Sequence, residues 1–348
     1  GALLLSGCSS SDSDSAGGAY AGPLKDTPGT INVLAWPGYA EDGSTDPNVD
    51  WVTPFEKATG CTVNVKTYGT SDEAVQLMQS GGYDVVSASG DASLRLIFGG
   101  DLQPVNLDLI PNYADVFDNL KDRPWNTIDG ANYGVPHGRG ANVLQYTIDK
   151  VKPAPTSWSV VWEPNSPLKG KITAYDSAIY IADAAVYLMS TKPDLGITDP
   201  YALDQTQFDA AMELLKQQKP LVAEYWADYT KYVAAVQAGS IVAGTSWQVI
   251  ANVLNGEKST VGAVKPKEGA TGWSDTWMIS KNTEAIDCAY KWLNWIISPA
   301  TNAQAAEYFG EAPANSKACA LTASKTHCES YHAEETDYWS NVYYWKTP

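Results

Sequence analysis

The chain has 348 residues, of which 44% are hydrophobic and 18% charged, a composition that fits a soluble globular protein of about two domains rather than a disordered or fibrous one. Its 40 acidic residues outnumber its 23 basic ones, and the net charge of −17 argues against nucleic acid as a partner and favours a cationic ligand. The aromatic residues are 13 Trp and 20 Tyr against 5 Phe, and such rings suit ligand walls as well as cores.

The amino-terminal residues indicate a processing signal rather than part of the fold. The apolar run Ala2–Leu5 leads through Ser6-Gly7 to Cys8, which resembles the bacterial lipobox, where signal cleavage precedes a Cys that becomes lipid-modified. Residues 9–18 are all Ser, Asp, Ala or Gly and are typical of a flexible tether. We expect a lipid anchor on Cys8 and a place in the periplasm or on the outer face of the cell membrane; the alternative is that Cys8 is an ordinary thiol.

Four further cysteines, an even number in an oxidising compartment, predict two disulfides. They are Cys61, Cys288, Cys319 and Cys328. Three pairings are possible; we favour Cys319 with Cys328, which closes a short polar loop, and, less strongly, Cys61 with Cys288. Their spacing and the lack of nearby His clusters argue against zinc, and we expect neither metal nor cofactor.

The first unit alternates strands and helices. Its elements are predicted as strands at residues 31–36, 62–66 and 83–87 and helices at 52–59 and 71–79, the second helix with Ser71 as N-cap. This βαβαβ succession predicts a parallel sheet with helices on both faces. The first strand delivers Trp36 and Tyr39 to a turn, where open α/β sheets bind ligands. The third strand enters a small-residue loop at residues 88–91.

A second unit follows a crossing segment at residues 132–140. It is predicted to contain strands at 142–148, 170–176, 240–247 and 261–264 and helices at 179–191, 205–218, 229–238 and 284–297. Two of these strands release Asp176 and Trp247 at their ends.

The segment Gly272-Trp273-Ser274-Asp275 follows, with Trp277 close by. A ring and a carboxylate at this spacing offer an organic cation a π-face and a counter-charge. The alternative is that Trp273 belongs to the core and Asp275 caps a turn.

Short segments along the whole chain carry a family resemblance. They are Leu34-Ala35-Trp36-Pro37-Gly38-Tyr39, Phe55-Glu56-Lys57-Ala58-Thr59-Gly60, Thr67-Tyr68, Tyr83-Asp84-Val85-Val86, Tyr133-Gly134-Val135-Pro136, Trp162-Glu163-Pro164, Thr245-Ser246-Trp247, Pro266-Lys267-Glu268-Gly269 and Gly272-Trp273-Ser274-Asp275. In this order, over residues 29–346, the chain resembles the spermidine/putrescine-binding proteins, which are substrate-binding lipoproteins or periplasmic components of ABC transporters.

The resemblance implies an α/β, two-lobed periplasmic-binding-protein fold of type II. Each lobe would be a mostly parallel sheet flanked by helices, with the ligand cleft between the lobes. After a signal remnant and tether at 1–28, one lobe would comprise residues 29–139 plus 275–318 and the other 140–274 plus 319–348.

The resemblance also implies a ligand site. The matching residues are the aromatic pair Trp36 and Tyr39, the acid Asp176 for one amino group, the wall ring Trp247, and the ring and acid Trp273 and Asp275. An ammonium offers three donors and no acceptor, so carboxylates satisfy it, while its methylene stem needs flat apolar walls.

Further candidates for the site are Ser89, Asp91, Arg139 and Trp226. Five of the candidates have a structural alternative: Trp36 and Trp247 could be core residues, Asp176 a turn acid, Arg139 an ion-pair partner, and Trp226 part of a helix-capping loop.

Three positions depart from the family pattern. Ile179 stands where a second acid is usual, Ser89-Gly90-Asp91 where an aromatic is usual, and Arg139 where the family tends to have an aromatic or neutral residue. A lost acid and a gained guanidinium would suit a ligand with one ammonium and one carboxylate.

We therefore predict a monomeric, extracytoplasmic solute-binding protein that captures putrescine or spermidine by lobe closure and passes it to an ABC permease. The alternatives are a binding protein for a zwitterionic amine such as γ-aminobutyrate, a secreted carboxylate-dependent hydrolase, or a surface adhesin. Enzyme interpretations have little support, since the chain has three His, no G-x-S-x-G elbow and no phosphate loop.

Overall fold

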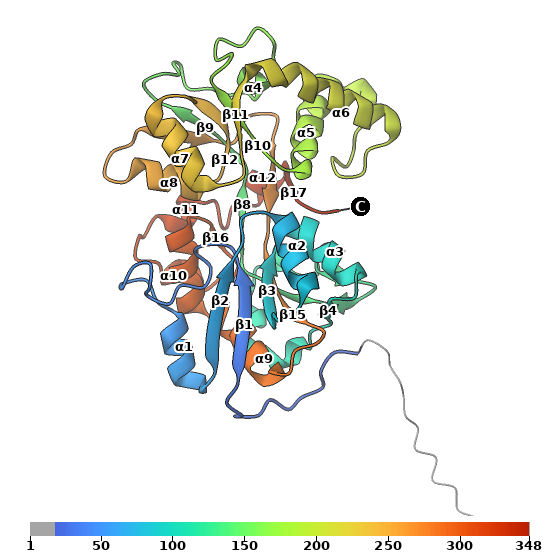
Figure 1. Cartoon of the computed structure of the whole chain (residues 1–348), viewed down its shortest axis with the longest axis vertical. Helices are drawn as coiled ribbons and strands as arrows, with labels where there is room; N and C mark the ends of the chain where they lie inside the picture. Colours follow the sequence, from blue (N-terminus) through green and yellow to red (C-terminus); the bar gives the residue numbers. More distant parts are fainter. Residues whose placement is uncertain (1–17, 348) are drawn as a thin grey trace, which may run out of the picture.

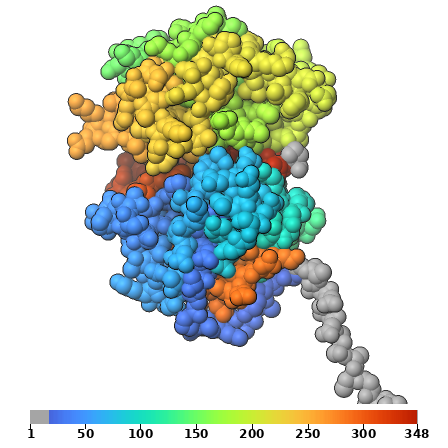
Figure 2. Space-filling model, viewed as in Figure 1, coloured from blue at the N-terminus to red at the C-terminus, as the bar shows by residue number. Residues whose placement is uncertain are grey.

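The computed structural model describes residues 18–347, which form two lobes, one above the other in Figure 1. The predicted lipidation site Cys8 lies outside the described residues. In the space-filling view, the red carboxy-terminal segment shows between the blue lower lobe and the yellow-green upper lobe (Figure 2).

The lower lobe is built on a six-stranded sheet of order β2-β1-β3-β15-β4, with β7 also paired to β15. The strands are β1 (Thr30–Ala35), β2 (Thr62–Thr67), β3 (Val85–Ala88), β4 (Leu102–Gln103), β7 (Gly134–Pro136) and β15 (Thr276–Ser280). Its helices are α1 (Val52–Thr59), α2 (Ser71–Ser80), α3 (Gly90–Phe98), α9 (Ile286–Ile296) and α10 (Pro299–Phe309). The predicted parallel pairing is confirmed, since β1 pairs in parallel with both β2 and β3.

The upper lobe is built on a five-stranded sheet of order β11-β10-β12-β9-β13. The strands are β9 (Val143–Thr147), β10 (Ile172–Tyr175), β11 (Val222–Trp226), β12 (Ala243–Ser246) and β13 (Val261–Val264). Its helices are α4 (Ser159–Trp162), α5 (Ile181–Thr191), α6 (Gln205–Gln218), α7 (Tyr229–Ala238) and α8 (Gln248–Asn255).

A four-stranded sheet of order β16-β8-β14-β17 lies between the lobes (Figure 1). Its strands are β8 (Gly138–Ala141), β14 (Ala270–Trp273), β16 (Ala312–Pro313) and β17 (Val342–Tyr344). The remaining elements include the hairpin of β5 (Thr127–Ile128) and β6 (Ala131–Asn132), α11 (His327–Ser330) and α12 (Thr336–Trp339). The chain passes to the upper lobe through β8 and returns through β14. The lobe boundaries given above stay a prediction, and this central sheet belongs to neither large sheet.

Each large sheet contains one reversed strand, and the crossing explains both. β9 runs antiparallel to β12 and β13, and β15 runs antiparallel to β3, β4 and β7. The strands β1 and β12 end where Trp36 and Trp247 meet, with ring centroids 5.5 Å apart. The chain enters each lobe from the central sheet, at the end of the lobe where Trp36 and Trp247 meet. The first strand after each crossing, β9 in the upper lobe and β15 in the lower lobe, must therefore run away from the cleft between the lobes. The other strands therefore point their carboxyl ends into the cleft, as in other open α/β sheets.

Two local predictions were wrong. The N-cap of α2 is Thr70, whose hydroxyl accepts a hydrogen bond from the Glu73 amide at 3.2 Å, and Ser71 is the first helical residue. Residues 88–91 are not a loop, because α3 begins at Gly90. A Cβ on Gly90 would clash with the carbonyl oxygen of Trp345, so glycine is needed there to let the carboxy-terminal segment approach.

Both favoured cysteine pairs are bonded in the structure. The bond between Cys61 and Cys288 joins the start of β2 to α9, with Cα atoms 5.9 Å apart, and Cys319 with Cys328 closes a surface loop, with Cα atoms 5.7 Å apart. Within residues 18–347, the helices are too short or too polar to cross a bilayer, and no group of acidic, His or Cys side chains could hold a metal ion.

Candidate functional site

Five predicted ligand residues line one small cavity between the lobes, which we call the acidic cavity. Its lining is Trp36, Tyr39, Trp247, Trp273, Asp275, Phe309 and Trp345. The rings touch across it: Trp36 meets Trp247 edge to face, and Trp273 meets Phe309 at a centroid distance of 5.7 Å. The space between them is about 10 Å³, enough for roughly one water molecule. The rings must therefore part before a larger molecule can enter.

Asp275 is the anion of this cavity. Its side chain follows β14, is 2% exposed, and accepts a hydrogen bond from the Tyr39 hydroxyl at Oδ2, 2.6 Å away. The other oxygen, Oδ1, has no hydrogen-bond partner among residues 18–347. Burial raises the pKa of Asp275 to about 7, with further repulsion from Glu311 and Asp91. A cation that reached Oδ1 would favour the ionised carboxylate, because a buried charge without a partner is costly.

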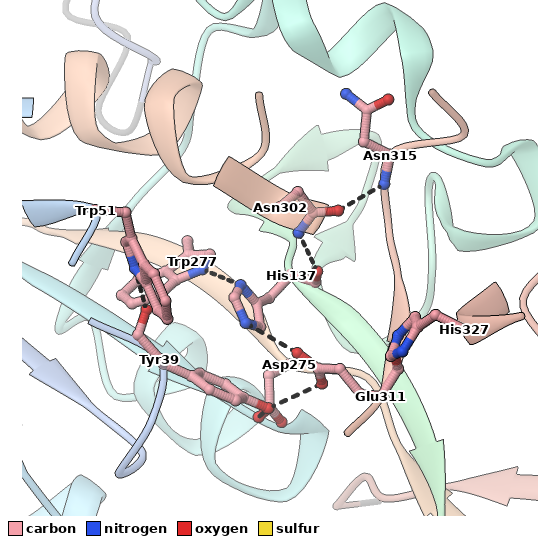
Figure 3. Close-up of polar contacts among 9 residues, drawn as sticks. All are labelled: Tyr39, Trp51, His137, Asp275, Trp277, Asn302, Glu311, Asn315 and His327. Atoms are coloured by element: carbon pink, nitrogen blue, oxygen red, sulfur yellow. Dashed lines mark hydrogen bonds and ion pairs between the residues drawn. The ribbon is translucent and has the colours of Figure 1, made fainter. Parts of the chain in front are cut away.

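A second acid, Glu311, lies beside Asp275 and was not predicted (Figure 3). Its Oε2 is 3.3 Å from the Tyr39 hydroxyl, and its Oε1 is 3.0 Å from Nε2 of His137. The indole nitrogen of Trp277 donates to His137 Nδ1 at 2.9 Å. Because an indole N–H can only donate, the proton of the neutral imidazole lies on Nε2 and faces Glu311.

Burial disfavours the charged form of both His137 and Glu311. Burial lowers the pKa of His137 to about 4 and raises the pKa of Glu311 well above its usual value. Asn302 fixes the His137 backbone, since its Nδ2 donates to the His137 carbonyl at 2.8 Å (Figure 3). The network therefore holds the Tyr39 hydroxyl in place, while burial opposes a second full charge beside Asp275.

One more predicted residue, Asp91, lies in the wall of a larger cavity of about 840 Å³, which we call the cleft cavity. Asp91 lines it, is 4% exposed, and accepts a hydrogen bond from Ser89 at 2.7 Å. Burial raises the pKa of Asp91. The two cavities are neighbours, because Trp345 lines the acidic cavity and Lys346 lines the cleft cavity.

The other predicted residues lie outside the acidic cavity. Asp176 is exposed and lines neither cavity, although the next residue, Ser177, lines the cleft cavity. Trp226 packs against Trp247 with ring centroids 4.9 Å apart and so supports the wall from behind. Arg139 lines a third cavity, which shares Trp273 with the acidic cavity. The structure thus does not bring Arg139 together with Asp275.

Phe309, Glu311 and Trp345 are among the residues of the acidic cavity and its network that escaped the sequence reasoning. Phe309 and Glu311 flank the end of α10, and Trp345 follows β17. None of them ends a strand of a large sheet, which was the signal that identified Trp36 and Trp247. Their positions depend on how α10 and the carboxy-terminal segment pack against the central sheet.

Comparison with known proteins gives the same fold and a family. The Listeria monocytogenes structure described as a putative spermidine/putrescine ABC transporter superposes with a TM-score of 0.75 at 22% identity, covering 90% of this chain and 92% of that one. The Escherichia coli (strain K12) spermidine/putrescine-binding periplasmic protein is 25% identical over 285 residues, 81% of this chain and 76% of the relative.

The Pseudomonas aeruginosa (strain UCBPP-PA14) putrescine-binding periplasmic protein SpuD is 28% identical over 267 residues, 72% of this chain and 70% of the relative. The model of the bacterial extracellular solute-binding protein family matches residues 50–329. The chain therefore belongs to the bacterial extracellular solute-binding proteins, a family of binding proteins rather than enzymes, and has their two-lobed type II fold.

Proposed function

We propose that the protein captures a diamine or polyamine, putrescine or spermidine, outside the cytoplasm and presents it to an ABC permease. The observation that carries the proposal is the buried Asp275 carboxylate, which lines a cavity walled by aromatic rings and whose Oδ1 lacks a partner among the described residues. An alkylammonium supplies the three donors and the positive charge that this oxygen needs, and its methylene stem fits the rings. Relatives named for spermidine and putrescine support the same ligand class.

The first ammonium would bind at Asp275. The Tyr39 hydroxyl occupies Oδ2 and so leaves Oδ1 for the ligand. Because the pKa of Asp275 is raised to about 7, binding of the cation would release a proton from the protein in part of the molecules at neutral pH.

The second ammonium would extend toward the cleft cavity and Asp91. The Asp91 charge contributes to the raised pKa of Asp275, so the two carboxyl groups are within electrostatic reach of each other. Tyr175 stacks on Trp345 with centroids 5.9 Å apart, between the end of β10 and the carboxy-terminal segment. Asp176, the acid predicted for this end, is exposed and remains a candidate if the lobes shift on binding.

A zwitterionic amine such as γ-aminobutyrate fits this arrangement less well. Its carboxylate would meet the negative potential of Asp275 and Asp91, because Arg139 lies across Trp273 and the two cations that line the cleft cavity, Arg95 and Lys346, are each paired with an Asp. Like charges at this range disfavour binding.

Capture would proceed by hinge closure. Trp36 comes from the lower lobe and Trp247 from the upper lobe, so opening of the lobes would separate the two rings and admit the ligand. We further propose that the protein acts as a monomer held at the membrane by a lipid on Cys8.

A thermal-shift screen followed by isothermal titration calorimetry tests the proposal. Putrescine or spermidine should raise the melting temperature, since a ligand of the folded state stabilises it by mass action, whereas γ-aminobutyrate and glycine betaine should not. Mass spectrometry should recover the ligand unchanged. A response to γ-aminobutyrate alone would overturn the diamine assignment, and a converted ligand would indicate the hydrolase alternative.

A further inference from the structure

A third cavity, of about 470 Å³, lies across Trp273 from Asp275 and has the opposite charge character; we call it the basic cavity. It is lined by parts of β8 and β13 and by the carboxy-terminal segment at residues 330–339. Arg139, Lys265 and His332 line it, and its lining contains no Asp or Glu. In a chain with a net charge of −17, a cavity with cations and no acid is a local reversal of charge.

Arg139 is a buried cation whose charge is not neutralised. It is 3% exposed, and its guanidinium lies over the Trp339 ring at 4.3 Å. Its hydrogen bonds go to neutral groups, the Ala333 carbonyl and the Tyr344 hydroxyl, each at 3.2 Å, and Nε has no partner. Over residues 18–347, no carboxylate lies within ion-pair distance of Arg139. Burial of an unpaired charge is costly.

Lys265 makes the same kind of cation–π contact with the neighbouring ring, that of Tyr338. Its Nζ lies over Tyr338 at 4.3 Å and donates to the Tyr338 carbonyl at 2.6 Å and to the side chain of Asn341. The Tyr338 and Trp339 rings are 5.0 Å apart, so Arg139 and Lys265 cover adjacent aromatic faces. Burial lowers the pKa of Lys265, as expected where no anion compensates the charge.

The third basic residue of the lining, His332, lies close to one acid. Its ring stacks on Tyr338 at 3.8 Å, and its Nδ1 is 2.9 Å from Glu335, which does not line the cavity. That carboxylate is 52% exposed and, among the described residues, makes no ion pair with Arg139 or Lys265.

We propose that the basic cavity is a second ligand site, which binds a small oxyanion, a carboxylate or a phosphate, between Arg139 and Lys265. Such an anion neutralises both charges, and the planar guanidinium suits the oxygens of either group. The two ammonium groups of a diamine would be repelled by Arg139 and Lys265. The basic cavity is therefore a ligand site distinct from the acidic cavity. Trp273 separates the two sites and lies against Gly140, where a Cβ would clash with its ring.

Calorimetry and thermal shifts on the ligand-free full chain test this site. Sodium succinate and inorganic phosphate are compared with sodium chloride at equal ionic strength. We expect a saturable rise in melting temperature with one or both oxyanions beyond the chloride effect. A response to succinate alone identifies a carboxylate site and a response to phosphate alone a phosphate site; no response beyond chloride overturns the proposal.

Matched variants locate the response. Lys265→Gln should weaken oxyanion binding at least tenfold, whereas Lys267→Gln, at an exposed position two residues along, should not change it. Asp275→Asn should also leave it intact, which separates this test from the diamine proposal. If Lys265→Gln does not fold by circular dichroism, Arg139→Lys keeps the charge but loses the planar fork and should weaken binding. Equal effects of the two Lys variants would place the anion elsewhere and contradict the site.

Discussion

The two faces of Trp273 differ in charge although aromatic rings line both. On one face, Asp275 lies among Trp36, Trp247 and Phe309, and on the other, Arg139 and Lys265 lie over Trp339 and Tyr338. Rings alone would accept many amines and many aromatic or apolar ligands. The difference teaches that the buried charge, more than the ring content, decides which ligand each cavity can hold.

The largest expected effect comes from removal of the Asp275 charge in the acidic cavity. Asp275→Asn should weaken putrescine binding about 10- to 150-fold, the range for loss of a charge-assisted hydrogen bond. Calorimetry measures it, with Asp149→Asn as control, because the Asp149 side chain is 90% exposed. A dissociation constant within twofold of wild type would remove Asp275 from the site.

The next effect tests whether the rings of the two faces are interchangeable. Trp247→Leu should weaken putrescine binding about 2- to 30-fold, since one cation–π face is lost. Trp339→Leu, which alters only the basic cavity, should leave putrescine affinity unchanged. Equal losses in both variants would show that the faces are not separate.

The third effect is a pH dependence of ligand binding, which should be confined to the acidic cavity. With a pKa of about 7, Asp275 is mostly neutral at pH 6 and mostly ionised at pH 8, so putrescine should bind about tenfold more weakly at pH 6. Titrations in buffers of different ionisation enthalpy should show proton release near pH 7. A constant affinity over this range would contradict the raised pKa.

The same pKa predicts how the stability of the ligand-free protein changes with pH. The folded state keeps the Asp275 proton at pH values where the unfolded chain has lost it, so the free energy of unfolding should fall as the pH rises from about 4 through 7. Burial gives Asp183 in α5 a similar pKa of about 7. Chemical denaturation of Asp275→Asn should therefore lose the Asp275 part of this slope and retain the parts from Asp183, Glu311 and Asp91, whose pKa values are also raised.

Much of the fold was predictable because its signals are local. The helix predicted at 205–218 is α6, residue for residue, and β1, β2 and β3 lie where short apolar or alternating segments predicted strands. The insertion of β15 between β3 and β4 was not predicted, because its register depends on where the chain returns from the upper lobe. No pattern within residues 276–280 encodes that return.

The candidate site likewise contains residues that could be predicted from the sequence and residues that could not. Trp36 and Trp247 were found because each follows a strand that ends in the cleft, and the structure brings both to Asp275. Glu311 and Trp345 could not be found, since they reach the site through packing of α10 and the carboxy-terminal segment. Arg139 was named as a candidate from the sequence, but the face of the central sheet on which its side chain lies was not predictable. Successive side chains of a strand point to opposite faces, and only the pairing register determines which face each one occupies. Ligand contact by the predicted residues stays a prediction.

A crystal structure of the protein with putrescine tests the central claim most directly. We expect one ammonium nitrogen roughly 2.7–2.9 Å from Asp275 Oδ1, with Trp36, Trp247 and Trp273 parted around the methylene chain. A diamine bound in the cleft cavity or the basic cavity, with Asp275 still bonded only to Tyr39, would contradict the account.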